Sequence, residues 1–131
     1  MTENLHLHSI HHVAIIVSDY VKSKKFYTEL LELKIIQETY RADRDSYKLD
    51  LKIGDSEIEL FSFPNPPNRV DSPEAAGLRH LSFVVTDIKA TTLKLNERGI
   101  ITEPIRVDPT TNKKYTFFKD PDGLPLELCE K

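Results

Sequence analysis

The chain has 131 residues, of which 39% are hydrophobic and 30% charged, with a formal net charge of −3. These values are typical of one compact globular domain and exclude a disordered or membrane-spanning chain. The acidic balance and the lack of a basic tract argue against a nucleic-acid partner. One cysteine, Cys129, excludes an internal disulfide, and the first residues do not resemble a secretory signal. We therefore expect a cytoplasmic protein that binds neither nucleic acid nor membrane.

In chain order, the first elements are a β-branched strand and a helix. The helix follows the N-cap pair Ser18-Asp19 and has lysines opposite its apolar side. Three further strands follow, with Gly54-Asp55 at a hairpin turn between the last two. The predicted elements are a strand over 10–17, a helix over 20–32, and strands over 33–40, 47–53 and 57–62.

The second part of the chain repeats this order after a connector over 64–77. Four prolines in the connector favour an extended backbone without helix. The helix that follows should end at Gly99, which suits the C′ position. The predicted elements are a strand over 78–85, a helix over 88–98, and strands over 101–107, 113–118 and 124–129.

Two histidines and two glutamates recur at a constant offset of 68 residues. His12 corresponds to His80, and Glu59 corresponds to Glu127. The flanking residues also match, because both histidines open an apolar strand that ends in a polar residue and Asp. We therefore predict a single domain over 1–131, with one β-α-β-β-β module over 8–63 and a second over 78–131.

This repeat indicates a divalent-metal site. Side chains alternate along a strand, so we expect His11 and His12 to point in opposite directions, and the repeat selects His12. Glu59 and Glu127 are each flanked by aliphatic residues, so each faces either a polar cavity or water. Two imidazoles and two carboxylates suit one zinc, nickel, cobalt, manganese or iron ion, and the ligand set does not choose among these metals.

These residues resemble the vicinal oxygen chelate superfamily, the group of glyoxalase I, the bleomycin-resistance proteins and the extradiol dioxygenases. The resemblance spans nearly the whole chain and includes Gly77-Leu-Arg-His80 and Asp120-Pro-Asp-Gly123. The stretches 59–64 and 106–109 are similar to a small bacterial subgroup, the YaeR-like proteins. Membership implies an α+β fold in which two tandem modules form an eight-stranded, cup-shaped mixed sheet with helices on the outside.

The resemblance also assigns roles to residues. The four metal ligands of glyoxalase I correspond to His12, Glu59, His80 and Glu127, and the last glutamate of that enzyme moves a proton between neighbouring substrate carbons. Glu127 is therefore the candidate catalytic base. Family members use ligands from one chain or from two, and the connector permits either arrangement. We expect a homodimer by resemblance alone.

Other residues are candidates for a substrate pocket. Glyoxalase I has an arginine that contacts the glutathione carboxylate where this chain has Ile16, and some bacterial enzymes have an asparagine where it has Phe63. Glutathione-dependent activity is therefore not expected. Lys113, Tyr115 and Phe117 share a strand face that looks into the cup in the family. Phe117 either packs a substrate or belongs to the core, and Arg44 either covers the mouth of the cup or is a surface charge.

Three functions fit these features. The first is a metal-dependent lyase or isomerase for a small molecule that chelates the ion through adjacent oxygens. The second is a protein that sequesters a ligand without chemistry, as bleomycin-resistance proteins do. An extradiol-type dioxygenase is least favoured, because a fourth protein ligand at Glu59 would crowd out oxygen.

Overall fold

The computed structural model describes residues 4–131 and contains two β-α-β-β-β units in succession. The α-helix of the first unit continues directly as one π-helical segment, Phe26–Leu30, and a short 3-10 turn, Ala42–Arg44, precedes its third strand. The first unit comprises β1 (His12–Val17), α1 (Tyr20–Lys25), β2 (Lys34–Arg41), β3 (Ser46–Ile53) and β4 (Ser56–Ser62). The second comprises β5 (Leu81–Val85), α2 (Ile88–Glu97), β6 (Arg106–Val107), β7 (Lys114–Lys119) and β8 (Pro125–Glu130).

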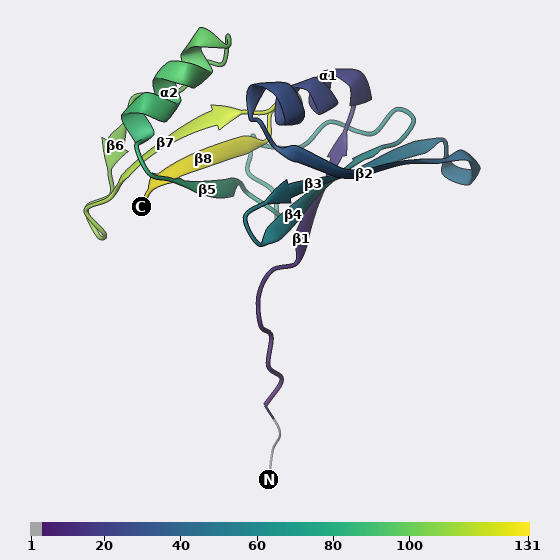
Figure 1. Ribbon diagram of the computed structural model, residues 1–131, viewed down its shortest axis with the longest axis horizontal. Helices are drawn as coiled ribbons and strands as arrows, with labels where there is room; N and C mark the ends of the chain where they lie inside the picture. Colours follow the sequence, from purple (N-terminus) through teal and green to yellow (C-terminus); the bar gives the residue numbers. More distant parts are fainter. Residues whose placement is uncertain (1–3) are drawn as a thin grey trace.

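The eight strands divide into two four-stranded mixed sheets with the same topology. The first sheet has the order β1-β4-β3-β2, and the second has the order β5-β8-β7-β6. In each sheet the first strand pairs in parallel with the fourth, and the other neighbours are antiparallel. Figure 1 shows the two sheets side by side, with α1 above the first and α2 above the second. The predicted α+β class and the repeated strand order are confirmed.

Alternation along the strands separates a core face from an open face in each sheet. On β4, Ile58 and Leu60 are buried under the helix, and their counterparts on β8 are Leu126 and Leu128. Helical residues of both units belong to the same hydrophobic cluster. They are Phe26 and Tyr27 of the π-helical segment that continues α1, and Ile88 and Leu95 of α2. The opposite face, which we call the open face, presents His12, Ala14, Ile16, Lys48, Asp50, Glu59 and Phe61 in the first sheet, and Ser82, Val84, Tyr115, Phe117, Glu127 and Cys129 in the second.

Two element predictions need correction. The strand expected over 101–107 is only Arg106–Val107, because Pro104 has no N–H for the strand ladder and interrupts the pairing with β7. The helix expected over 20–32 is α-helical only to Lys25, and its continuation is π-helical. The expected end of the second helix is confirmed, because Gly99 has φ +83° and the Ile100 N–H donates to the Leu95 carbonyl at 2.9 Å.

Polar contacts from the turn after β7 hold the two sheets together. The Tyr27 hydroxyl is fully buried and donates to the Asp120 carboxylate at 2.8 Å. The Ser18 backbone N–H donates to Asp122 at 3.1 Å. Because Tyr27 and Ser18 belong to the first unit and the two aspartates to the second, this turn fixes the relative position of the two open faces.

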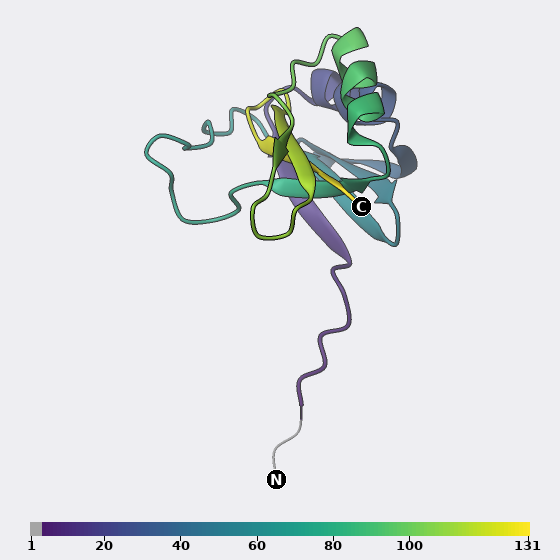
Figure 2. The same ribbon diagram turned by 90° about the vertical axis from the view of Figure 1, so that its left-hand side faces the viewer.

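Two segments extend away from this body. The connector, residues 64–77, projects sideways from the sheets in Figure 2, and residues 4–11, before β1, run away from them in both views. Leu5 and Leu7 in that segment are 83% and 85% exposed. Within residues 4–131, the helices are too short and too polar to cross a bilayer.

Candidate metal centre

The first His–Glu pair lies on the open face of the first sheet. His12 begins β1 and Glu59 lies in the neighbouring strand β4, with Ala14 and Glu59 as register partners. The Nδ1 atom of His12 is 3.6 Å from Oε2 of Glu59. Glu59 is buried, with 9% of its surface exposed, although its strand neighbours Ile58 and Leu60 occupy the core face. The structure therefore brings His12 and Glu59 together on one face of the first sheet.

The second pair has the same composition on the second sheet. His80 directly precedes β5, and its Nε2 atom is 3.7 Å from Oε1 of Glu127 in β8. The His80 ring makes an edge contact with Phe117, with ring centroids 5.1 Å apart. Phe117 is the register partner of Glu127, so the aromatic ring lies beside the pair on the same face.

The two pairs do not meet within one chain. Among residues 4–131, no group of three or more histidine, cysteine, aspartate or glutamate side chains is placed to hold an ion. Each pair offers one imidazole nitrogen and one carboxylate oxygen. Atoms that bind one ion at ~2.0–2.2 Å lie roughly 3–3.5 Å apart. The pairs, at 3.6 Å and 3.7 Å, would need only a small contraction to form half of a four-ligand centre each.

The expectation that His11 and His12 point in opposite directions was wrong. Their Nδ1 atoms are 2.8 Å apart, and the two rings form an edge contact with centroids 5.1 Å apart. Strand alternation applies only within a strand, and β1 begins at His12. His11 is therefore free to turn toward its neighbour.

Lys48 and Asp50 of β3 adjoin the first pair. The Lys48 ammonium is 2.8 Å from Asp50 and 3.8 Å from Glu59. The hydrogen bond to Asp50 raises the pKa of Lys48, so this ammonium is charged at neutral pH. The first pair thus has a fixed positive charge beside it, which compensates the buried carboxylate of Glu59.

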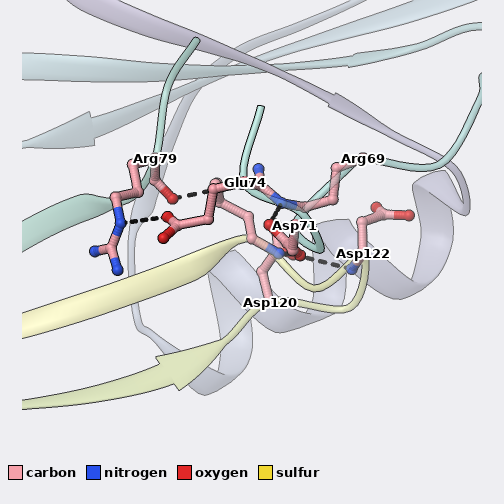
Figure 3. Close-up of polar contacts among 7 residues, drawn as sticks. Arg69, Asp71, Glu74, Arg79, Asp120 and Asp122 are labelled. Carbon is pink, nitrogen blue, oxygen red and sulfur yellow. Dashed lines mark hydrogen bonds and ion pairs between the residues drawn. The ribbon is translucent and has the colours of Figure 1, made fainter. Parts of the chain in front are cut away.

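Arg79 adjoins the second pair. It lies 3.2 Å from Nδ1 of His80, and since a guanidinium only donates, this nitrogen is the acceptor. Coordination of an ion through Nε2 requires the proton on Nδ1, so Arg79 must move when His80 becomes a ligand. Figure 3 shows Arg79 paired with Glu74 of the connector, at 2.6 Å, beside the pair formed by Arg69 and Asp71.

Cys129 borders the second pair, two residues after Glu127 on β8. Its Sγ atom lies 3.2 Å from the hydroxyl of Ser82 on the adjacent strand β5. Burial raises the pKa of the Cys129 thiol, and the nearby Glu127 acts in the same direction. Cys129 is therefore a neutral thiol on the open face.

The predicted pocket residues fall in different places. Tyr115 and Phe117 line a cavity of about 570 Å³, together with Arg79, Arg106 and Glu74. Ile16 lines a separate cavity of about 310 Å³, between β1, the connector and the Asp120–Asp122 turn. The ring of Phe63 lies parallel to that of Phe61, and Lys113 is an exposed residue just before β7. Only Tyr115 and Phe117 lie beside a His–Glu pair.

Three residues near the first pair were not identified from the sequence. They are Arg41, Lys48 and Phe61, which lie on three adjacent strands of the first sheet. Lys48 and Phe61 have the strand parity of the open face, which is a usable signal. Arg41 ends β2, which contains a bulge between Ile35 and Gln37. Because a bulge shifts the alternation of side chains, the sequence does not show which face of the sheet Arg41 lies on.

Comparison with known proteins decides the family. A sequence model of the Glyoxalase/Bleomycin resistance protein/Dioxygenase superfamily matches residues 9–128. The chain belongs to this superfamily. The match covers both His–Glu pairs and all eight strands except the last two residues of β8.

Bacterial relatives resemble the chain over nearly their whole length. YwkD of Bacillus subtilis (strain 168) is 61% identical over 126 residues, covering 95% of this chain and 98% of the relative. YaeR of Escherichia coli (strain K12) is 54% identical over 128 residues, covering 97% and 99%. The crystal structure of a glyoxalase family protein from Enterococcus faecalis is 52% identical, covers 94% of this chain and 98% of that chain, and has a TM-score of 0.89. The resemblance to YaeR-like proteins is thus confirmed.

Proposed function

We propose that this protein is a divalent-metal-dependent, glyoxalase-like lyase or isomerase. Its substrate is a small molecule that chelates the ion through two adjacent oxygens. The observation that supports this proposal is the pair of matched His–Glu contacts, 3.6 Å and 3.7 Å apart, on equivalent strands of two sheets. Nitrogen and carboxylate oxygen donors suit zinc, nickel, cobalt, manganese or iron.

The same proposal includes a homodimer whose two sites are shared between subunits. His12 and Glu59 of one subunit would meet His80 and Glu127 of the other, since neither pair alone completes a site. A two-fold axis makes two equivalent sites from two such half-sites. A divalent ion bound there would supply positive charge that stabilises the negative charge developing on the substrate oxygens.

Glu127 is the proposed base. Its carboxylate would take a proton from one substrate carbon and return it to the neighbouring carbon, so no net proton is consumed. Phe117, beside His80 and opposite Glu127 in the register, would hold the apolar part of the substrate and limit water near the base. Ile16 is an apolar side chain where glyoxalase I has an arginine, which favours a substrate other than a glutathione adduct.

Matched glutamate substitutions test this proposal. Purified Glu59→Gln and Glu127→Gln should each lose metal affinity by roughly 10- to 100-fold or more, because a neutral amide replaces a charged ligand. Glu97→Gln is the control, since Glu97 is an exposed residue at the end of α2 and lies outside the open faces of the sheets. Metal content after dialysis against each candidate ion measures the effect.

Turnover then separates the two glutamates. At saturating metal, Glu59→Gln should recover part of its activity on a panel of 2-oxoaldehyde adducts and hydroxyketones. Glu127→Gln should stay about 10²–10⁴-fold below the unmodified protein, because it also lacks the base. Equal recovery by both variants would remove Glu127 as the base, and metal-independent turnover would overturn the proposal as a whole.

A further inference from the structure

Arg41 differs in its surroundings from the other arginines of the chain. The other five arginines of the chain each lie within 4 Å of a carboxylate, in pairs with Asp43, Asp71, Glu74, Glu32 and Glu103. Among residues 4–131, no such contact is formed by Arg41. Arginine is rarely removed from water without an anion beside it, because the unpaired charge is costly. A partly buried guanidinium without a carboxylate therefore needs an explanation.

The surroundings of Arg41 leave its hydrogen-bond donors largely unused. Its guanidinium carbon lies 4.9 Å from the ring centre of Phe61 and 5.8 Å from that of Phe63. One terminal nitrogen donates to the Ser46 hydroxyl at 3.0 Å. The Nε–H group is buried and has no acceptor among the residues that the structure describes. Aromatic contacts occupy the faces of a guanidinium, while its N–H fork binds acceptors in its own plane.

This arginine is connected to the His12–Glu59 pair along the open face. Phe61 lies two residues after Glu59 on β4, about 7 Å further along the strand. Between them, the Lys48 ammonium is 3.8 Å from Glu59 and 6.0 Å from the Phe61 ring centre. The open face therefore presents a proposed metal ligand at Glu59, and next to it a group of cationic and aromatic side chains, Lys48, Phe61 and Arg41.

We propose that Arg41 is a specificity-determining residue that binds a carboxylate or phosphate group of the substrate. The inference rests on the proposed function for its reaction, but the anion subsite itself requires no metal. The substrate would chelate the ion with two oxygens at one end and present an anionic group roughly 10 Å away, a distance set by the strand spacing. A planar fork of donors suits either anion through paired hydrogen bonds.

The Arg41 side chain itself reports binding. In a ¹H–¹⁵N spectrum of the full chain, its buried Nε–H should shift saturably on titration with succinate or with inorganic phosphate at constant ionic strength. A shift with succinate would identify a carboxylate as the group that Arg41 binds, and a shift with phosphate would identify a phosphate group. The titration is made without metal and repeated with metal, so that loss of the anion subsite is distinguished from loss of the metal site.

Three variants complete the test. Arg41→Gln removes the charge, and Arg41→Lys keeps the charge but loses the planar fork; both should weaken anion binding at least about tenfold. Arg44→Gln is the matched control, because Arg44 lies on the adjacent 3-10 turn with its side chain 61% exposed. It should bind the anion as the unmodified chain does.

Several results would overturn this inference. One is an Arg41 Nε–H resonance that shifts with neither anion. Another is anion binding by Arg41→Lys that is as tight as that of the unmodified chain. A change of oligomeric state in Arg41→Gln without loss of anion binding would assign Arg41 to a subunit contact instead. Because the Nε–H titration uses the unmodified chain, the test does not depend on the folding of any variant.

Discussion

Glu59 and Lys48 set the electrostatics of the first pair. Glu59 is nearly excluded from water, and Lys48 holds a positive charge 3.8 Å from it. An ion that binds Glu59 and His12 must approach this ammonium. The cation that makes a buried carboxylate tolerable in the free protein therefore opposes binding of a second cation.

Replacement of Lys48 tests this opposition. Lys48→Met keeps an unbranched side chain that is one atom shorter and removes its charge, so we expect metal affinity to rise by about three- to tenfold. Isothermal titration with the metal that the unmodified protein retains measures the change. A weaker affinity would show instead that Lys48 orients Glu59 for coordination.

The repeat in the sequence identified residues that recur at a fixed offset along the chain. The constant offset singled out His12 and Glu59, and the structure places them together at 3.6 Å. The sequence could not reveal Arg41, because what distinguishes that residue is spatial: none of the carboxylates in residues 4–131 lies within 4 Å of its guanidinium. Nor could it orient His11, whose position depends on where β1 begins.

Among the elements, the turn between β7 and β8 joins the two sheets. Asp120 accepts hydrogen bonds from the Tyr27 hydroxyl and from the backbone N–H groups of Asp122 and Leu124. Gly123, with φ +85°, allows the chain to reverse there. The buried tyrosine and the buried aspartate therefore connect the segment after α1 to the second sheet.

Tyr27→Phe should destabilise the protein by about 1.5–3 kcal/mol, the usual cost of a lost hydrogen bond to a charged group. Chemical denaturation measures the free energy of unfolding. Tyr40→Phe is the control, because the Tyr40 hydroxyl makes a comparable hydrogen bond to Asp45, at 2.7 Å, on the surface. A loss in the control as large as that in Tyr27→Phe would contradict the importance of burial.

Asp120 also gives the stability a pH dependence. Burial raises the pKa of this carboxyl above its value in the unfolded chain, so the folded state holds the proton more tightly. Its contribution is complete below the unfolded pKa and is lost as the pH rises through the folded pKa. The stability of the unmodified protein relative to Asp120→Asn should therefore fall as the pH rises above about 4, the usual pKa of an aspartate. A relative stability that rises with pH there would contradict the assignment.

Most elements could be predicted because their apolar periodicity and their capping residues agree. The strand predicted over 101–107 is longer than the observed Arg106–Val107, because its β-branched residues favour a strand while Pro104 prevents continuous pairing. The π-helical segment after Lys25 was not predictable, since it depends on the packing of Phe26 and Tyr27 against the core.

In the molecule as a whole, one hydrophobic core lies between the helices and both sheets, and each open face presents one His–Glu pair. The repeat predicted that the four residues share an ion, but it did not show whether one chain or two would supply them. Local patterns determine the composition of each pair, whereas the relative placement of the sheets depends on distant contacts such as Tyr27–Asp120. Ligands from two subunits are the arrangement that we propose.

Subunit complementation tests this arrangement most directly. One variant carries His12→Ala and Glu59→Gln, and the other carries His80→Ala and Glu127→Gln; neither alone should bind metal at a complete site. When both are refolded together, half of the dimers should be mixed, and each mixed dimer should have one intact site. We expect recovery of about a quarter of the metal content of the unmodified protein. If native mass spectrometry shows mixed dimers that recover no metal, sites shared between subunits are contradicted.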